Sequence, residues 1–518
     1  MAEITVCRKD SYYDSVTLMT LSSKLKKLDG ITDAVVSMAT PMNKDLLENI
    51  GMLCGDLIDA GPNDLAIAIR GENDEACRMA FESIDALMQA KSNSKEEQPE
   101  SFRSIADAAA KSGPYDLAVI SVKGDFAARE AREALKHNMH VMLFSDNVTV
   151  EEEIELKKTA HEKGLLVMGP DCGTAILGGV GLCFSNEMRS GNIGLVAASG
   201  TGLQEVCVLI DRLGAGITQA IGTGGRDLSE AIGGIMMLDG IDLLDSDEAT
   251  EVIVVVSKPP APSIASKIID RLSQSAKPVV VCFIADRERE AVSGLHFATS
   301  LEDAAYKAVA LARGEGFGET AGTRFPVDEF VVAQAAAKLD AGQMYIRGLF
   351  CGGTLAAEAL FECSKALSKT MSNESKEPGL KMEDPFVSEG NCIVDLGDDV
   401  FTVGRPHPMI EPDLRCERIV QEASDPTCAV ILLDFEIGYG SNADPVGATL
   451  DAIARAHEAR RSLPGDIVFV GYVQGTEGDT QGLEAQRAKL AEAGVIVAES
   501  NFHAITIALR ILDAKGGR

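Results

Sequence analysis

Apolar runs rich in β-branched residues alternate with stretches of helical period along almost the whole chain. In the first ninety residues, short apolar runs at 4–7, 31–38 and 65–69 are separated by amphipathic segments. Helices that cover both faces of parallel sheets give such an alternation. The pattern therefore predicts a multi-domain α/β fold built on parallel sheets.

The length of the chain indicates more than one domain, because 518 residues exceed what a single hydrophobic core organises. The order of strands and helices predicts four domains, at residues 1–90, 102–190, 191–320 and 331–518. Residues 91–101 read KSNSKEEQPES, a charged segment with a proline that is typical of a linker. Within the last domain we expect residues 368–390 to form an inserted, flexible surface loop.

The composition is strongly acidic, with 79 Asp and Glu residues against 48 Lys and Arg residues and a net charge of -31. This charge argues against nucleic-acid and membrane partners, so we expect small anionic substrates held by local donors. The N-terminal sequence lacks the pattern of a secretory signal, and no apolar run approaches the roughly 18 residues of a membrane helix. We therefore expect a cytoplasmic protein.

Twelve cysteines are scattered along the chain without a C-x-x-C pair. This spacing supports neither a disulfide framework nor a zinc knuckle, so we expect mostly buried thiols and no metal site. The sequence also lacks the G-x-S-x-G, spaced His-pair and G-x-x-x-x-G-K-[ST] motifs. Acyl-serine chemistry and ordinary ATP hydrolysis therefore have no support.

A glycine turn between an apolar strand and a helix gives the strongest candidate site. The segment GLVAASGTGLQE places Ser199, Gly200, Thr201 and Gly202 where the strand ends and the helix opens. The first turn of a helix has free backbone N–H groups, and the helix dipole attracts anions to this end. We expect a phosphate-like anion here, although simple N-capping by Ser199 or Thr201 explains the same residues.

Two further glycine turns follow predicted strands, at the sheet edge where ligands bind in open α/β folds. In the first, Gly224 and Gly225 precede Arg226, which can bind a carboxylate or phosphate or can pair with Asp227. The second turn contains Gly352, Gly353 and Thr354. It repeats the strand, turn and helix plan of the first loop, so the two regions are either an internal repeat or two independent uses of one device.

The last domain adds two polar loops. In GRPHPM, two prolines fix the backbone on either side of His407 and exclude the interior of a helix or strand. A rigid loop with Arg405 and His407 suits substrate recognition and proton transfer, although a structural histidine in a tight turn gives the same pattern. Asp434 ends a strand and is the acid that we select from the second loop, whereas we expect a turn role for Asp444.

The segments GPDCGT, GNIGLVAASGTGLQE and IGTGGRDLSE resemble, in order and spacing, the α subunit of succinyl-CoA synthetase. That resemblance covers about residues 117–310 and implies Rossmann-like and flavodoxin-like domains of the succinyl-CoA synthetase type, with a CoA-binding-like domain at 102–190. The wider pattern, which includes SKPPAPS, CGGTLAAEAL, GRPHPMIEPDLR and LLDFEIGYGSNADP, resembles the FdrA family along essentially the whole chain.

Two departures from the synthetase pattern bear on function. The synthetase carries a phosphohistidine in a GHAG segment, where this chain reads IADREREAVSGLHFATS. The synthetase also binds CoA with a glycine loop after its first strand, but the first hundred residues here contain no cluster of glycines. We therefore expect phosphoryl chemistry without CoA or any other cofactor, and with phosphate or carbamoyl phosphate as substrate.

The FdrA resemblance implies a component of an oxamate carbamoyltransferase in allantoin and purine breakdown, which acts with companion subunits in an oligomer. That reaction converts oxalurate and phosphate to oxamate and carbamoyl phosphate, and backbone N–H groups and arginines would stabilise its transition state. On this hypothesis Arg226, Arg405 and His407 are catalytic, and the three glycine loops with Asp434 bind the substrate. The alternatives are an ADP-forming acyl-CoA synthetase and a non-catalytic scaffold or metabolite-sensing subunit.

Overall fold

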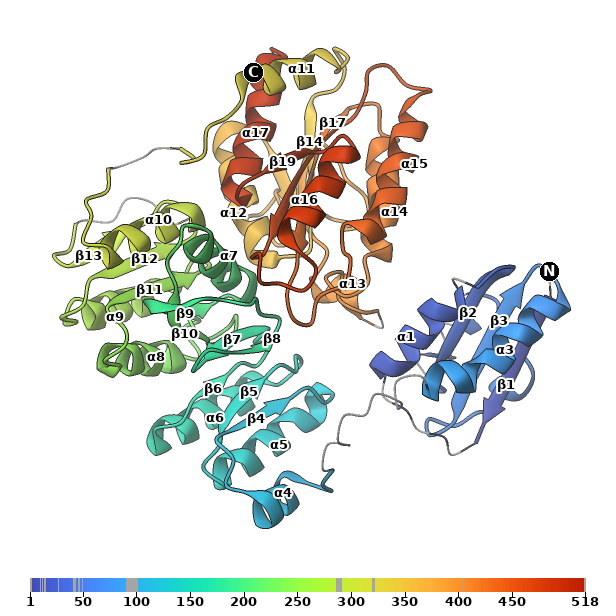
Figure 1. Cartoon of the computed structure of the whole chain (residues 1–518), viewed down its shortest axis with the longest axis horizontal. Coiled ribbons are helices and arrows are strands. Elements are labelled where there is room, and N and C mark those ends of the chain that lie inside the picture. The colour runs from blue at the N-terminus through green and yellow to red at the C-terminus, as the bar shows by residue number, and fades with distance from the viewer. Residues whose placement is uncertain are drawn as a thin grey trace. The chain divides into compact units, whose positions relative to one another are not determined.

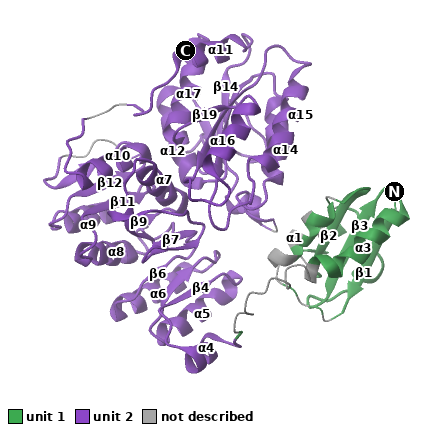
Figure 2. Cartoon of the chain, viewed as in Figure 1, with its two compact units in different colours: residues 1–101 green, residues 102–518 purple. Residues whose placement is uncertain are grey.

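The computed structural model describes residues 2–516 apart from 10, 12, 14, 27, 41–42, 45–46, 49, 90–100, 286–290, 319–321 and 404. Gly404 and most of the expected linker at 91–101 lie outside the described residues. The chain divides into two compact units, Met1–Ser101 and Phe102–Arg518 (Figure 2).

The first unit contains a three-stranded antiparallel sheet in the order β1-β3-β2. Its elements are β1 (Ala2–Arg8), α1 (Ser15–Lys26), β2 (Ile31–Met38), the 3-10 helix η1 (Gly55–Leu57), β3 (Leu65–Gly71) and α3 (Asp74–Gln89). The central strand is buried on both faces, with Ile67 and Ile69 in one apolar cluster and Ala66 and Ala68 in another. The continuous apolar run of this strand therefore reflects its place in the middle of the sheet.

The second unit begins with a small parallel sheet in the order β4-β5-β6. Its elements are α4 (Ile105–Ser112), β4 (Leu117–Ile120), α5 (Gly124–Lys136), β5 (His140–Leu143), α6 (Val150–Lys163) and β6 (Val167–Met168). The helix α6 begins at the cap Thr149 and ends at Gly164, which has a left-handed backbone that suits glycine.

A seven-stranded sheet follows, in the order β13-β12-β11-β9-β10-β7-β8. Its strands are β7 (Thr174–Leu177), β8 (Val180–Cys183), β9 (Ser190–Ala198), β10 (Ile217–Gly222), β11 (Val252–Ser257), β12 (Val279–Phe283) and β13 (Leu295–Phe297). Its helices are α7 (Gly200–Arg212), α8 (Ile235–Ser246), α9 (Pro262–Leu272) and α10 (Leu301–Ala312). The hairpin of β7 and β8 is antiparallel and the other strands are parallel.

The last sheet has six parallel strands in the order β15-β16-β14-β17-β18-β19. The strands are β14 (Tyr345–Phe350), β15 (Thr370–Ser372), β16 (Asn391–Asp395), β17 (Cys428–Glu436), β18 (Val468–Gln474) and β19 (Ile496–Ala498). The helices are α11 (Glu329–Ala337), α12 (Gly353–Ala366), α13 (Asp399–Thr402), α14 (Asp413–Ala423), η2 (Gly447–Thr449), α15 (Leu450–Arg460), α16 (Leu483–Glu492) and α17 (Asn501–Ala514).

The predicted α/β class with parallel sheets is confirmed for the second unit, whereas the sheet of the first unit is antiparallel. Our expectation of a loop throughout 368–390 is wrong at β15, which pairs with β16 at the sheet edge. The residues of β15 read TMS, and so short and polar a strand leaves no apolar run in the sequence.

The two large sheets share one strand order and one core. Without β7, β8 and β15, both follow the order second, first, third, fourth, fifth of flavodoxin-like folds. Helices α7 and α10 of one domain pack against α12 and α17 of the other, as Figure 1 shows for α7 and α12. Side chains of both domains therefore belong to a single buried apolar cluster, which fixes how the two sheet edges meet.

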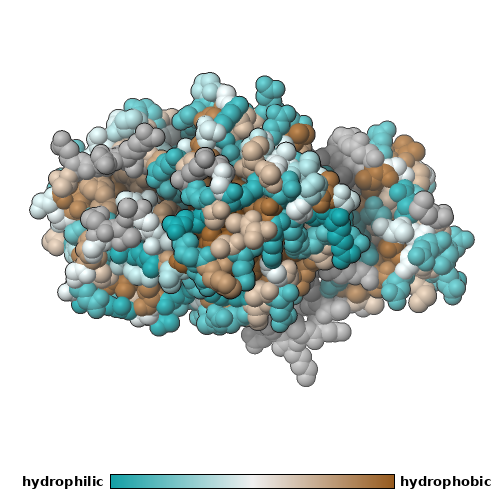
Figure 3. All heavy atoms as spheres, turned by 90° about the horizontal axis from the view of Figure 1, so that it is seen from above, coloured by the Kyte–Doolittle hydropathy of each residue, from teal (hydrophilic) through white to brown (hydrophobic). Residues whose placement is uncertain are grey.

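The surface of the chain mixes polar and apolar side chains. On the face shown in Figure 3, brown and teal residues are interspersed rather than gathered into one broad apolar area. Within the described part of the chain, every helix is too short or too polar to cross a bilayer.

Candidate functional site

The carboxyl ends of strands from both large sheets open on one cavity of about 590 Å³. Ser199 follows β9, Lys258 follows β11, Cys351 follows β14 and Asp395 ends β16, and all four line the cavity. The loops that follow β4 and β5 in the small parallel sheet form a further wall. The cavity thus lies at the edge where parallel α/β sheets bind ligands.

Two helix N-termini meet at this cavity. Ser199 caps α7 by accepting a hydrogen bond from the Gly202 N–H at 3.0 Å, and its hydroxyl lies 2.6 Å from that of Thr354 in the first turn of α12. The Thr354 N–H in turn donates to the Thr201 hydroxyl at 3.3 Å. Because both helix dipoles end at one place, the contact concentrates positive potential where an anion can bind.

Lys258 adds a full positive charge to the cavity. Its ammonium lies 2.8 Å from the Glu374 carboxylate, which belongs to the other large domain. Burial lowers the pKa of Lys258, but the carboxylates of Glu374 and Asp395 outweigh this effect and raise its pKa overall. A protonated Lys258 beside the start of α12 can therefore exchange Glu374 for an anionic ligand.

Two carboxyl groups in the cavity have raised pKa values. Burial raises the pKa of Asp395 to about 7, against the opposing effect of Lys258. Desolvation by the surrounding protein raises the pKa of Asp171 to about 6, and the neighbouring carboxylates of Asp399 and Asp146 raise it further. Asp171 lines the cavity and is itself exposed there. Asp395 can therefore gain or lose a proton near neutral pH.

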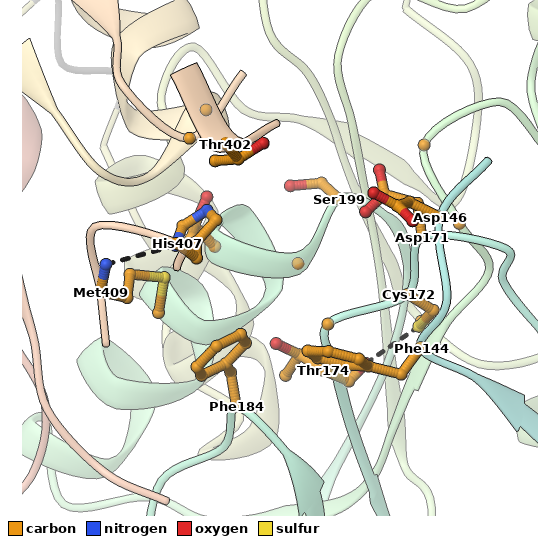
Figure 4. A pocket seen from close by; sticks show the side chains of 18 of the residues that line it. Phe144, Asp146, Asp171, Cys172, Thr174, Phe184, Ser199, Thr402, His407 and Met409 are labelled. Atoms are coloured by element: carbon orange, nitrogen blue, oxygen red, sulfur yellow. Dashed lines mark hydrogen bonds between the residues drawn. The ribbon is translucent and has the colours of Figure 1, made fainter. Parts of the chain in front are cut away.

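His407 lies in an apolar part of the cavity. Its ring faces Phe184 at a centroid distance of 6.0 Å, and its Nδ1 accepts a hydrogen bond from the Met409 N–H at 3.2 Å (Figure 4). Loss of hydration lowers the pKa of His407 to about 4, so the ring is neutral at pH 7. Because Nδ1 is an acceptor, the neutral ring carries its proton on Nε2 and can donate it.

Most of the residues that the sequence suggests line this cavity. They are Ser199, Gly200, Thr201, Gly224, Gly225, Gly353, Thr354, Arg405 and His407. Gly224 has a φ of +86°, and an added Cβ would meet the backbone of Gly169 and Pro170, so only glycine fits there. The binding and catalytic roles of these residues stay predictions.

Four predicted residues are not among the residues that line the cavity. Arg226 lies 2.9 Å from Glu153 of α6 and donates to the Val148 carbonyl at 2.7 Å, so it contacts the region of the small parallel sheet. Asp434 is fully buried and accepts hydrogen bonds from the N–H groups of Cys351 and Gly352, both at 2.8 Å. A Cβ on Gly202 would meet the side chains of Ser199 and Thr354, so this glycine lets the two loops approach each other. A Cβ on Gly352 would meet the side chains of Asp434 and Glu436.

Lys258, Asp395, Thr174 and Gln204 line the cavity but did not stand out in the sequence. In the structure Lys258 directly follows β11 and Asp395 ends β16, but we predicted no strand from the sequence at 391–395. Single polar residues at strand ends are common, so the sequence did not distinguish them from turn residues.

A buried group of Cys351, Asp434 and Glu436 lies behind the start of α12, with ligand atoms that all fall within 4.8 Å of one another. The guanidinium of Arg415 is 2.9 Å from the Cys351 sulfur and 3.5 Å from an Asp434 carboxylate oxygen. This buried cation opposes the binding of a metal ion. As predicted for the cysteines in general, eight of the twelve are buried.

Three family models match parts of the chain. The model described as AllF, heavy metal-associated domain, matches residues 1–104; the CoA binding domain matches 188–285 and CoA-ligase matches 349–511. The CoA binding match falls on the seven-stranded sheet, whereas we expected the CoA-binding-like domain at 102–190. Our domain boundaries stay predictions.

The heavy-metal description does not fit the side chains of the first unit. Among its described residues, no group of three His, Cys, Asp or Glu side chains brings its ligand atoms together. The Cys77 thiol donates to the Ala2 carbonyl and the Cys54 thiol to the Glu3 carboxylate, both at 3.5 Å. We therefore assign no metal to this unit.

Curated relatives of part of the chain are CoA ligases. The succinate–CoA ligase [ADP-forming] subunit alpha 1 of Archaeoglobus fulgidus is 26% identical over 36% of this chain and 63% of its own length. The malate–CoA ligase subunit alpha of Methylorubrum extorquens is 25% identical over 35% of this chain and 62% of its own length. The solved dinucleotide-forming acetyl-coenzyme A synthetase 1 of Ca. Korarchaeum cryptofilum is 17% identical over 82% of this chain and 87% of its own, with a TM-score of 0.34, from which we draw no conclusion.

These matches correct the enzyme class that we expected. The sequence led us to a carbamoyltransferase, but the matching domains and curated relatives are those of CoA ligases, so the assignment to the transferases is wrong. The chain has a domain architecture of the succinyl-CoA synthetase type, with CoA-binding and CoA-ligase domains behind an AllF-type N-terminal domain.

One relative extends over nearly the whole chain. The uncharacterized protein YahF of Escherichia coli (strain K12) is 46% identical over 498 residues, which cover 96% of each chain. Because identity at this level spans all the domains described above, the chain belongs to the family of YahF.

Proposed function

We propose that this chain is a component of a ligase of the acyl-CoA synthetase type and that its cavity binds the phosphate of an acyl phosphate. The contact between Ser199 and Thr354 carries the proposal, because it brings the N-termini of α7 and α12 to one point. Lys258 supplies a positive charge at the same place. Such a site stabilises the charge that develops on a leaving phosphate.

The reaction we propose transfers an acyl group from phosphate to a thiol. The thiol sulfur attacks the acyl carbon, the bond from that carbon to the phosphate oxygen breaks, and phosphate leaves with both electrons of that bond. Asp395 takes the thiol proton, which its raised pKa permits near neutral pH. The Nε2–H of His407 and the charge of Arg405 at the cavity rim orient the acyl phosphate.

The match of residues 188–285 to the CoA binding domain supports CoA as the thiol. Our expectation from the sequence that CoA is not a ligand is still untested, so a CoA titration decides between the two. Because the chain lacks a nucleotide-binding G-x-x-x-x-G-K motif, we propose that a companion subunit makes the acyl phosphate. We also propose that the chain is a member of the FdrA family and that it acts in the cytoplasm with such companion subunits.

The test is an assay of the purified chain with acetyl phosphate and CoA, which follows release of phosphate and formation of thioester together. We expect the two products in equal amounts and a rate that falls at least tenfold when Thr354→Val removes the hydroxyl that joins the two loops. Gly316→Ala is the control, because a Cβ there meets no atom within 4 Å. Phosphate release that ignores CoA, or no turnover with or without companion subunits, would contradict the proposal.

A further inference from the structure

Two buried oxygen atoms in the cavity wall have no hydrogen-bond partner among the described residues. They are the Thr174 hydroxyl and the Gln204 amide oxygen, and each residue is only 2% exposed. Both residues line the cavity. Because a buried polar atom without a partner is unfavourable by about 1–3 kcal/mol, atoms of this kind in a cavity wall indicate contacts with a ligand.

The two side chains lie on the same side of α7. Gly200 and Gln204 are four residues apart on this helix and therefore share a face. A Cβ built on Gly200 would lie 3.6 Å from the Thr174 hydroxyl, so Thr174 faces the start of the same helix. Figure 4 shows Thr174 between Phe144 and Phe184, below Ser199 at the anion site.

Neighbouring hydrogen bonds fix the orientation of the Gln204 amide. The Asn186 amide nitrogen donates to the Ile437 carbonyl and to the Asp479 carboxylate, both at 2.8 Å, so the Asn186 oxygen must be its acceptor atom. That oxygen accepts from the Gln204 amide nitrogen at 3.1 Å. The remaining atom of Gln204 is therefore an oxygen that can only accept a hydrogen bond.

We propose that Thr174 and Gln204 form a neutral subsite for an N–H or O–H group carried by the acyl part of the substrate. An amide or hydroxyl donates to the Gln204 oxygen and exchanges a hydrogen bond with the Thr174 hydroxyl. A carboxylate on the acyl group has only acceptor atoms, so one of its oxygens would face the Gln204 oxygen without a hydrogen bond between them. The inference rests on the proposed function, because it assumes that an acyl phosphate occupies the cavity.

Two aromatic rings flank Thr174 in this subsite (Figure 4). Phe144 and Phe184 have their ring centroids 5.6 Å apart, and Phe184 belongs to a small apolar cluster with Cys351 and Met409. The subsite therefore combines an apolar surface with two oxygen atoms that have no hydrogen-bond partner in the described part of the chain. The substrate class is therefore an acyl group with one uncharged hydrogen-bond donor.

Glycolate and propionate test this class, because they differ only by a hydroxyl in place of a methyl group. Each acid is titrated calorimetrically into the full chain in the presence of inorganic phosphate. We expect wild type to prefer glycolate by about tenfold, the factor that one net hydrogen bond gives. Thr174→Val keeps the shape of the side chain and should reduce the preference to about threefold or less, whereas Thr174→Ser should retain it.

Ser185→Ala is the matched control, because the Ser185 hydroxyl is also buried with no hydrogen-bond partner in the described part of the chain but is not among the residues that line the cavity. It should keep the preference for glycolate. Equal binding of the two acids by wild type, binding of neither acid, or an unchanged preference in Thr174→Val overturns the inference. A separate titration with phosphate alone reports on the anion site, so failure of the subsite and failure of the proposed function give different results.

Discussion

Replacement of Gly202 by alanine should separate the two helix N-termini. A Cβ at this position would lie well inside van der Waals contact with the Ser199 hydroxyl and 2.7 Å from the Thr354 methyl carbon. Because Gly202 lies one residue beyond Thr201 in the first turn of α7, the backbone cannot move without disturbing the cap. The added methyl group must therefore push the α12 loop away.

The substitution should lower both the stability of the fold and the affinity for phosphate. Overpacking is unfavourable by about 1–3 kcal/mol, and loss of the cap from Ser199 adds about 1 kcal/mol. Alanine in place of glycine within a helix offsets these effects by up to about 1 kcal/mol. A helix N-terminus contributes about 1–2 kcal/mol to a partly buried anion, so withdrawal of α12 should weaken phosphate binding roughly tenfold.

The assay is calorimetric titration of wild type and Gly202→Ala with inorganic phosphate, with circular dichroism as a check that the fold is intact. Gly316→Ala should match wild type in both measurements, because a Cβ there meets no atom within 4 Å. If Gly202→Ala keeps its structure and binds phosphate as tightly as wild type, the anion does not bind between α7 and α12, and the reasoning fails.

Three other substitutions test the site. Lys258→Met removes the ammonium that pairs with Glu374 and should weaken phosphate binding about tenfold in the same titration. Unchanged affinity for phosphate would exclude Lys258 from the anion site. Burial raises the pKa of Asp395 to about 7, so protonation stabilises the native state at acid pH, and this stabilisation is lost as the pH rises from about 4 through 7. Asp395→Asn should remove this contribution, on the order of 4 kcal/mol, from urea unfolding followed by circular dichroism between pH 4 and pH 8, and an unaltered pH dependence would contradict the raised pKa. Asp434→Asn places an amide against the N–H groups of Cys351 and Gly352 and should lower the free energy of unfolding by about 2–4 kcal/mol; an unchanged urea midpoint would show that these bonds do not stabilise the loop.

The order of apolar, polar and glycine residues was enough to predict the fold class and the loops that line the cavity. Hydrophobic periodicity is a local property, so alternating apolar runs and helical stretches predict strands, helices and parallel sheets without knowledge of distant contacts. Glycine and hydroxyl residues at the end of an apolar run also report local geometry, and for this reason the sequence pointed to Ser199, Thr201, Gly353 and Thr354, which line the cavity. The edge strand β15 was missed because it is short and polar.

Which loops meet in the cavity, and which charged groups lie beside them, depends on how the domains pack together. Ser199 and Thr354 are 155 positions apart and touch because helices of both large domains pack into one layer. The raised pKa of Asp395 depends on its burial, a quantity that no local pattern encodes. Arg226 resembled a ligand-binding residue in the sequence, yet it pairs with Glu153. Contacts between segments far apart in the chain follow from packing, and therefore appear only once the domains are assembled.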